Sequence, residues 1–151
     1  MPMYRFWDYI VGKHHKTNMA TNESMIQTLS SLLVEEEVLQ TPFYAIVEEK
    51  GRQKNNGFCF IGTTESVLLF AFLNSRATEV MRTARIPLKE IDNIEMKKTS
   101  FMNQVLIKIV LYNDACIQIS ASTKALKGDF VNQEMHLLCF IERLYTFNEA
   151  E

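Results

Sequence analysis

The sequence is poor in glycine and cysteine, and each shortage excludes a class of function. Only five glycines occur in 151 residues, and neither glycine-rich fingerprint of a nucleotide-binding loop is present. The three cysteines, Cys59, Cys116 and Cys139, lie far apart and lack the spacing of a zinc site. We therefore expect no metal, no cofactor and three reduced thiols in a reducing compartment.

Long hydrophobic runs are also missing. The longest, residues 67–73, has seven residues, whereas a membrane-spanning helix needs about 20. Asp8 interrupts the N-terminal apolar segment, and the pair Ile10 and Val11 is too short for the core of a signal peptide. These patterns predict a protein of the cytoplasm.

The charge is nearly balanced, with 16 Lys and Arg against 18 Asp and Glu and a formal net charge of −2. A nucleic-acid-binding domain usually carries a basic excess, so we expect no nucleic acid partner. Hydrophobic residues make up 47% of the chain, which is enough for one folded domain with a buried core.

The first forty residues differ in pattern from the rest. A first predicted helix ends at Gly12, and a polar link over residues 13–22 separates it from a second helix that Thr21 or Asn22 would cap. Three consecutive acids at positions 35–37 predict a solvated helix end or loop. We assign residues 1–40 to an N-terminal helical extension and residues 41–151 to a separate domain. The apolar positions of the two helices are Met3, Phe6, Trp7, Ile10 and Val11, then Met25, Ile26, Leu29, Leu32 and Leu33.

From residue 41 onward the hydrophobic period changes to two, which is typical of half-buried strands. Residues 67–73 are apolar at every position and predict a strand covered on both faces. Asn113 and Asp114 form a two-residue turn between the last two strands. The predicted strands are residues 43–47, 58–61, 67–73, 79–86, 91–98, 105–112 and 117–120.

The chain ends in a predicted amphipathic helix with a cap at Asp129 or Asn132 and with His136 on its polar side. Burying five of its large side chains contributes on the order of 10 kcal/mol, so the helix must belong to the core. The predicted fold is α+β and mainly β: a bent, seven-stranded antiparallel sheet or partly open barrel, capped by this helix. The apolar face comprises Met135, Leu137, Leu138, Phe140, Ile141, Leu144, Tyr145 and Phe147.

Two motifs carry a resemblance to a known family. A glycine–strand–turn–strand unit occupies residues 57–70, and an isoleucine–proline–leucine unit with a following acid and isoleucine occupies residues 86–94. In both, the chain resembles the bacterial PH-like domains of the pleckstrin-homology and GRAM superfold, over about residues 41–147. Glu65 departs from the family, which often carries a basic residue there. The resemblance implies a non-enzymatic PH-like domain, and also oligomers, because bacterial members self-associate.

The loop after the first strand carries Lys50, Arg52 and Lys54. In eukaryotic PH domains this loop holds inositol phosphates, so the resemblance implies an anion-binding or lipid-binding site here. Three basic groups contribute about 1 kcal/mol each beside an anionic bilayer, and roughly 3 kcal/mol corresponds to a dissociation constant weaker than millimolar. Weak contact with phospholipid headgroups at a membrane surface is therefore the alternative function.

Catalytic arrangements are missing from the sequence. No Gly-x-Ser-x-Gly nucleophile motif occurs. His14 and His15 are adjacent and cannot share one helix face, which makes them poor joint metal ligands. Cys139 and His136 have the i, i+3 spacing of helix neighbours but lack an orienting acid nearby. We expect no catalytic residues and no enzymatic activity.

Protein binding has two predicted surfaces. One is the first helix, where Phe6, Trp7 and Ile10 are the expected anchors unless they dock on the protein's own sheet. The other is a sheet edge, which invites the addition of a strand. The leading hypothesis is therefore a protein-interaction or self-assembly module, whose partner is another protein or a second copy of the chain.

Overall fold

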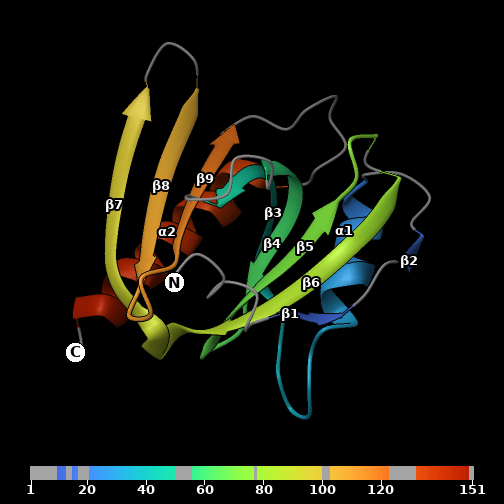
Figure 1. The fold of residues 1–151 in the computed structure, drawn as a ribbon, viewed down its shortest axis with the longest axis horizontal. Coiled ribbons are helices and arrows are strands. Elements are labelled where there is room, and N and C mark those ends of the chain that lie inside the picture. Colours follow the sequence, from blue (N-terminus) through green and yellow to red (C-terminus); the bar gives the residue numbers. More distant parts are fainter. Residues whose placement is uncertain are drawn as a thin grey trace.

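The computed structural model describes residues 10–12, 15–16, 21–49, 56–76, 78–99, 103–122 and 132–149 (Figure 1). The helices within these ranges are α1 (Asn22–Ser30), α2 (Gln133–Glu149) and the short 3-10 helix η2 (Leu88–Glu90). The strands are β1 (Ile10–Gly12), β2 (His15–Lys16), β3 (Gln40–Glu49), β4 (Asn56–Thr63), β5 (Val67–Leu73), β6 (Glu79–Pro87), β7 (Ile91–Thr99), β8 (Gln104–Leu111) and β9 (Cys116–Ser122).

All strand pairs are antiparallel, and the strands follow one another across the sheet in the order β1-β6-β5-β4-β3-β9-β8-β7, with β2 also paired to β6. Strand β3 joins the two halves of the sheet, because it pairs with β4 on one side and with β9 on the other. Figure 1 shows β7, β8 and β9 on the left and β4, β5 and β6 on the right, with the sheet bent between them. The seven predicted strands correspond to β3–β9 and are confirmed.

Strand β5 is buried at every residue, as its sequence predicts. The alternate side chains Leu68, Phe70 and Phe72 belong to the main core, inside the bend of the sheet. The intervening side chains, including Leu69 and Ala71, belong to a second cluster beneath α1. A continuous apolar run is therefore needed here, because each face of the strand is covered by a different layer.

Helix α1 covers the outer face of β3, β4 and β5 with Met25 and Leu29, both fully buried. Its N-terminus is capped as predicted by Thr21, whose hydroxyl accepts a hydrogen bond from the Ser24 backbone N–H at 3.1 Å. The helix ends at Ser30, so Leu32 and Leu33 pack on the second cluster from the loop that follows it.

Helix α2 closes the main core, as predicted. The Phe140 ring is fully buried and meets the Phe43 ring edge-on at a centroid distance of 4.8 Å. At the start of the helix, the Gln133 side chain donates hydrogen bonds to the backbone carbonyls of Tyr44 at 2.8 Å and Ser122 at 3.1 Å. These contacts fix the helix to both halves of the sheet.

The predicted apolar face of α2 is too broad. Met135 and Leu138 are 53% and 42% exposed, whereas the buried set is Leu137, Phe140, Ile141 and Leu144. The sheet covers only one stripe of a 17-residue helix, so apolar residues that lie outside this stripe remain at the surface.

The predicted first helix is wrong where it reaches Ile10. Residues 10–12 form strand β1, and Ile10 lies opposite Ala84 of β6. The physical reason is long-range, because the edge of β6 offers unpaired backbone N–H and C=O groups that a strand satisfies and a helix does not. The helical spacing of a few apolar residues is a weaker local preference.

Candidate functional site

The basic residues proposed for anion binding, Lys50, Arg52 and Lys54, lie outside the described residues. The flanking strands are well defined, since Glu48 of β3 pairs with Asn56 of β4. The segment that carries the three basic residues is therefore the connection of a β-hairpin. The predicted partner-binding residues Phe6 and Trp7 also lie outside the described residues, and Ile10 belongs to β1.

The cysteines and His136 occupy three kinds of environment. Cys59 is fully buried, and desolvation raises the pKa of its thiol well above the ordinary range. Cys116 is half-buried and Cys139 is exposed. His136 was predicted to be exposed, but it is half-buried, with Nδ1 lying 2.8 Å from the Pro42 carbonyl oxygen. Its ring therefore ties α2 to the start of β3.

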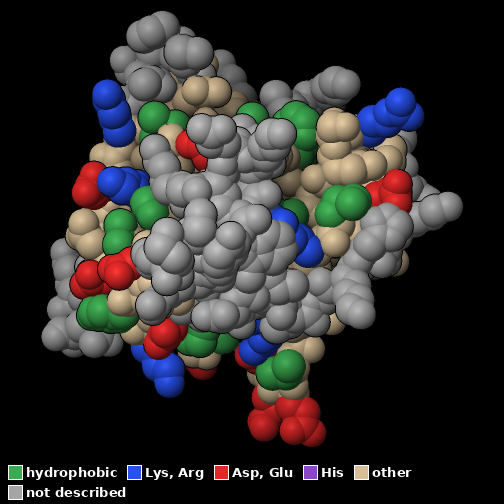
Figure 2. All heavy atoms as spheres, viewed as in Figure 1, with side chains coloured by type: hydrophobic (Ala, Val, Ile, Leu, Met, Phe, Trp, Pro, Cys, Tyr) green, Lys and Arg blue, Asp and Glu red, His purple; other side chains and the backbone are tan. Residues whose placement is uncertain are grey.

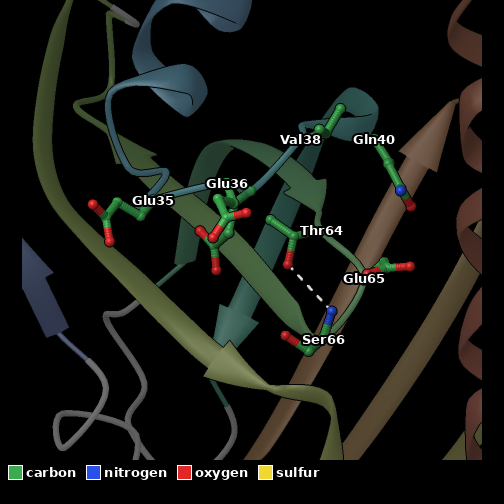
Figure 3. A pocket seen from close by; sticks show the side chains of 8 residues that line it. Glu35, Glu36, Val38, Gln40, Thr64, Glu65 and Ser66 are labelled. Atoms are coloured by element: carbon green, nitrogen blue, oxygen red, sulfur yellow. Dashed lines mark hydrogen bonds between the residues drawn. The ribbon is translucent and has the colours of Figure 1, made fainter.

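An open pocket of about 450 Å³ lies between the loop that precedes β3 and the turn that joins β4 to β5 (Figure 3). In that turn, the Thr64 hydroxyl accepts hydrogen bonds from the backbone N–H groups of Ser66 at 3.2 Å and Val67 at 3.1 Å. Four acids contribute to the walls, so the pocket opposes the binding of phosphate and other anions. The described lining residues are Glu35, Glu36, Glu37, Val38, Gln40, Thr64, Glu65 and Ser66.

One of these acids is held in an ion pair. The Arg85 guanidinium of β6 donates two hydrogen bonds to the Glu37 carboxylate, at 2.7 and 2.8 Å, and a third to the Leu32 carbonyl oxygen at 2.8 Å. The hydrogen bond from Arg85 lowers the pKa of Glu37 from 4.5 to about 2. The acidic run was predicted to be a solvated helix end or loop. It lies in a loop, but Glu37 anchors that loop to the sheet, and of the three acids only Glu35 and Glu36 are exposed.

The two outer edges of the sheet differ in how they are covered. At one edge, β6 is paired along part of its length by β1 and β2. At the other edge, β7 pairs with β8, and within the described ranges no strand pairs with its outer side. Figure 1 shows β7 along the left margin of the molecule, beside β8. An open strand of this kind is a template for an added strand.

Strand β7 has nine residues and is regular beyond a bulge between Ile91 and Asn93. Ile91 and Ile94 are buried in the main core, and Met96 is 40% exposed. Glu95 and Lys97 are exposed, and Glu95 lies opposite Lys108 of β8. Figure 2 shows acidic, basic and hydrophobic side chains close together along the same left margin. Within the described ranges, the edge therefore combines backbone groups that no other strand pairs with and charges of both signs.

Among the described residues, no group of three or more His, Cys, Asp and Glu side chains is placed to hold a metal ion. No helix within the described ranges is long and apolar enough to cross a membrane.

No protein-family model matches the sequence, and no curated protein matches it with significance. Among solved structures, the chain is similar to the hSac2 domain from the human phosphoinositide phosphatase Sac2, with a TM-score of 0.55 and 13% identity over 85% of this chain and 80% of that one. It is also similar to a DUF1696 family protein with a pleckstrin-homology domain from Shewanella loihica, with a TM-score of 0.45 and 13% identity over 91% of this chain and 99% of that one.

At these identities the likeness concerns the fold alone. The strand order agrees with it, because the β3–β6 and β7–β9 segments form the two halves of a bent antiparallel sheet and one C-terminal helix closes the core between them. The architecture expected from the sequence is confirmed: a bent, seven-stranded antiparallel sheet is closed by a C-terminal helix, in a fold similar to that of the hSac2 domain.

Proposed function

We propose that this protein is a protein-interaction and self-assembly module that binds a partner by adding a strand to the edge of β7. The supporting observation is the asymmetry between the two sheet edges. The edge of β6 is partly occupied by the protein's own β1 and β2, whereas the nine residues of β7 have a pairing partner on one side only within the described structure. Backbone hydrogen bonds supply affinity in strand addition, and side chains set the register.

The edge of β7 bears only some of the features that normally block strand addition. Of those features it has two lysines, Lys97 and Lys98, and a bulge that lies at the start of the strand, between Ile91 and Asn93. The residues that follow contain no proline. An exposed methionine at position 96 lies between Glu95 and Lys97, so a partner with alternating charges would gain both apolar and ionic contacts.

The second part of the proposed function is that Phe6 and Trp7 also bind a partner protein. The chain that follows these residues enters the sheet at Ile10, on the β6 edge. In the strand order, β1 and β7 stand at opposite ends of the sheet.

The β7 edge is tested by placing the same lysine at two exposed methionines. Met96→Lys puts a charge on the edge strand, which natural proteins use to prevent strand addition. Met135→Lys makes the same change on the exposed face of α2. Wild-type and both variant baits are used for capture from the native cell. We expect partner proteins that are retained by the wild-type and Met135→Lys baits but are lost with the Met96→Lys bait. Equal retention by the two variants would refute the proposal.

The alternative function is weak binding of anionic headgroups by the β3–β4 connection. Two observations support this function. Lys50, Arg52 and Lys54 all belong to the segment that connects β3 and β4. The chain also shares its fold with a domain of a phosphoinositide phosphatase. Vesicles that contain phosphatidylserine should sediment the wild-type protein more than the Lys50→Ala/Arg52→Ala/Lys54→Ala variant, and the difference should vanish at high salt. Equal sedimentation at low salt would dismiss this function.

A further inference from the structure

The charges of β7 specify how a second copy of the chain could pair with it. This inference rests on the proposed function, because it names the strand that occupies the β7 edge. Consecutive exposed residues of the strand are Glu95, Met96 and Lys97. A partner strand is therefore selected by an acid and a base that flank one apolar residue.

Symmetry restricts the registers in which β7 can pair with itself. In an antiparallel pair, two residues that lie opposite each other have their side chains on the same face of the sheet. Both also belong to the same kind of pair, either hydrogen-bonded or non-hydrogen-bonded. Two copies related by a two-fold axis use the same patch, so residue i faces residue j and residue j faces residue i. Both conditions are met only when one residue of the strand lies opposite its own copy. The register is thus defined by that central residue.

Within the regular part of the strand, residues 93–99, only one central residue gives opposite charges across the pair. Centring on Glu95 places two carboxylates face to face, and centring on Lys97 does the same with two ammonium groups, which is unfavourable. Centring on Ile94 opposes Asn93 to Glu95 and leaves Lys97 without an acidic partner. Centring on Met96 opposes Glu95 of each copy to Lys97 of the other, and the two exposed methionines meet on the axis.

We propose that β7 pairs with β7 of a second copy in an antiparallel, two-fold arrangement centred on Met96. The two sheets become continuous across the axis, and two Glu95–Lys97 pairs flank a Met96–Met96 contact. The bulge at the start of β7 limits the contact to the regular part of the strand. Because so short a ladder buries little surface, the dimer is weak and forms as protein concentration rises.

Disulfide trapping tests the register. In a Cys116→Ser/Cys139→Ser background only the buried Cys59 remains. Met96→Cys should then form a disulfide-linked dimer, because directly opposed residues have Cα atoms about 4.5–5.5 Å apart, within the range that a disulfide spans. Glu95→Cys alone is the matched control, since its two copies lie diagonally at about 7–8 Å and should not link. A mixture of Glu95→Cys and Lys97→Cys proteins should give the mixed dimer.

A charge exchange tests the pairing without a covalent bond. Glu95→Lys alone replaces both attractive pairs with repulsive ones, and the dimer dissociation constant measured by sedimentation should rise about tenfold or more. Adding Lys97→Glu should restore it. The in-chain repulsion between position 95 and Lys108 is the same in both variants, so the recovery reports the contact between copies.

The outcomes separate this inference from the proposed function. A wild-type chain that stays monomeric at all concentrations, or a self-linked Glu95→Cys dimer with no Met96→Cys dimer, would overturn the Met96-centred pair. The Met96-centred pair would also be overturned if the protein formed assemblies with an odd number of copies and if cysteines at positions 95, 96 and 97 formed disulfides equally well. The capture experiment with Met96→Lys would still decide whether the β7 edge binds other proteins.

Discussion

Replacing Phe140 with alanine should destabilise the fold by about 3–5 kcal/mol, the usual cost of removing a fully buried phenylalanine. Phe140 has no exposed surface and contacts the Phe43 ring in the main core, so the deletion leaves a cavity between α2 and β3. A loss of this size is a large part of the stability of an ordinary domain. Urea unfolding followed by circular dichroism measures it directly.

The control for this prediction lies two positions earlier on the same helix. Leu138 is 42% exposed, so Leu138→Ala should change the free energy of unfolding by less than about 0.5 kcal/mol. The difference between the two variants tests whether α2 packs on the core through the face that carries Phe140. Equal losses for the two variants would mean that the helix packs differently or is detached.

Removing the Glu37 carboxylate should change how stability depends on pH. Arg85 and Glu37 are 19% and 15% exposed and share two hydrogen bonds. The pKa of Glu37 is lowered from 4.5 to about 2 in the folded protein, so the unfolded chain binds the proton more readily than the folded protein does. The stabilisation is therefore complete above about pH 5 and is lost as the pH falls from 4.5 towards 2.

The expected magnitude is on the order of 2–3 kcal/mol. Glu37→Gln should be less stable than wild type by this amount at pH 7, and the two should converge near pH 2. Chemical unfolding at a series of pH values gives both curves. Glu35→Gln, an exposed acid in the same loop, is the matched control and should follow the wild-type curve. A constant difference between Glu37→Gln and wild type down to pH 2 would contradict the ion pair.

The candidate site was only partly accessible from the sequence. The sequence indicated that a sheet edge could take an added strand, but it did not name β7, because the identity of an edge depends on which strands pair. The alternation of Glu95 and Lys97 was visible in the sequence. It became informative only when β7 was found at the end of the strand order. The predicted contacts at Phe6, Trp7, Lys50, Arg52 and Lys54 remain proposals.

The sequence by itself determined the strands, the last helix and the fold class. Alternation of apolar and polar residues reports directly which side of a strand is buried, and the uninterrupted run of Val67–Leu73 reports burial on both sides. The tertiary structure alone decided that Ile10 joins a strand, that Met135 and Leu138 stay at the surface, and that Glu37 is paired with Arg85. Each of these outcomes depends on contacts between groups that are far apart in the sequence. A local sequence pattern cannot predict such contacts.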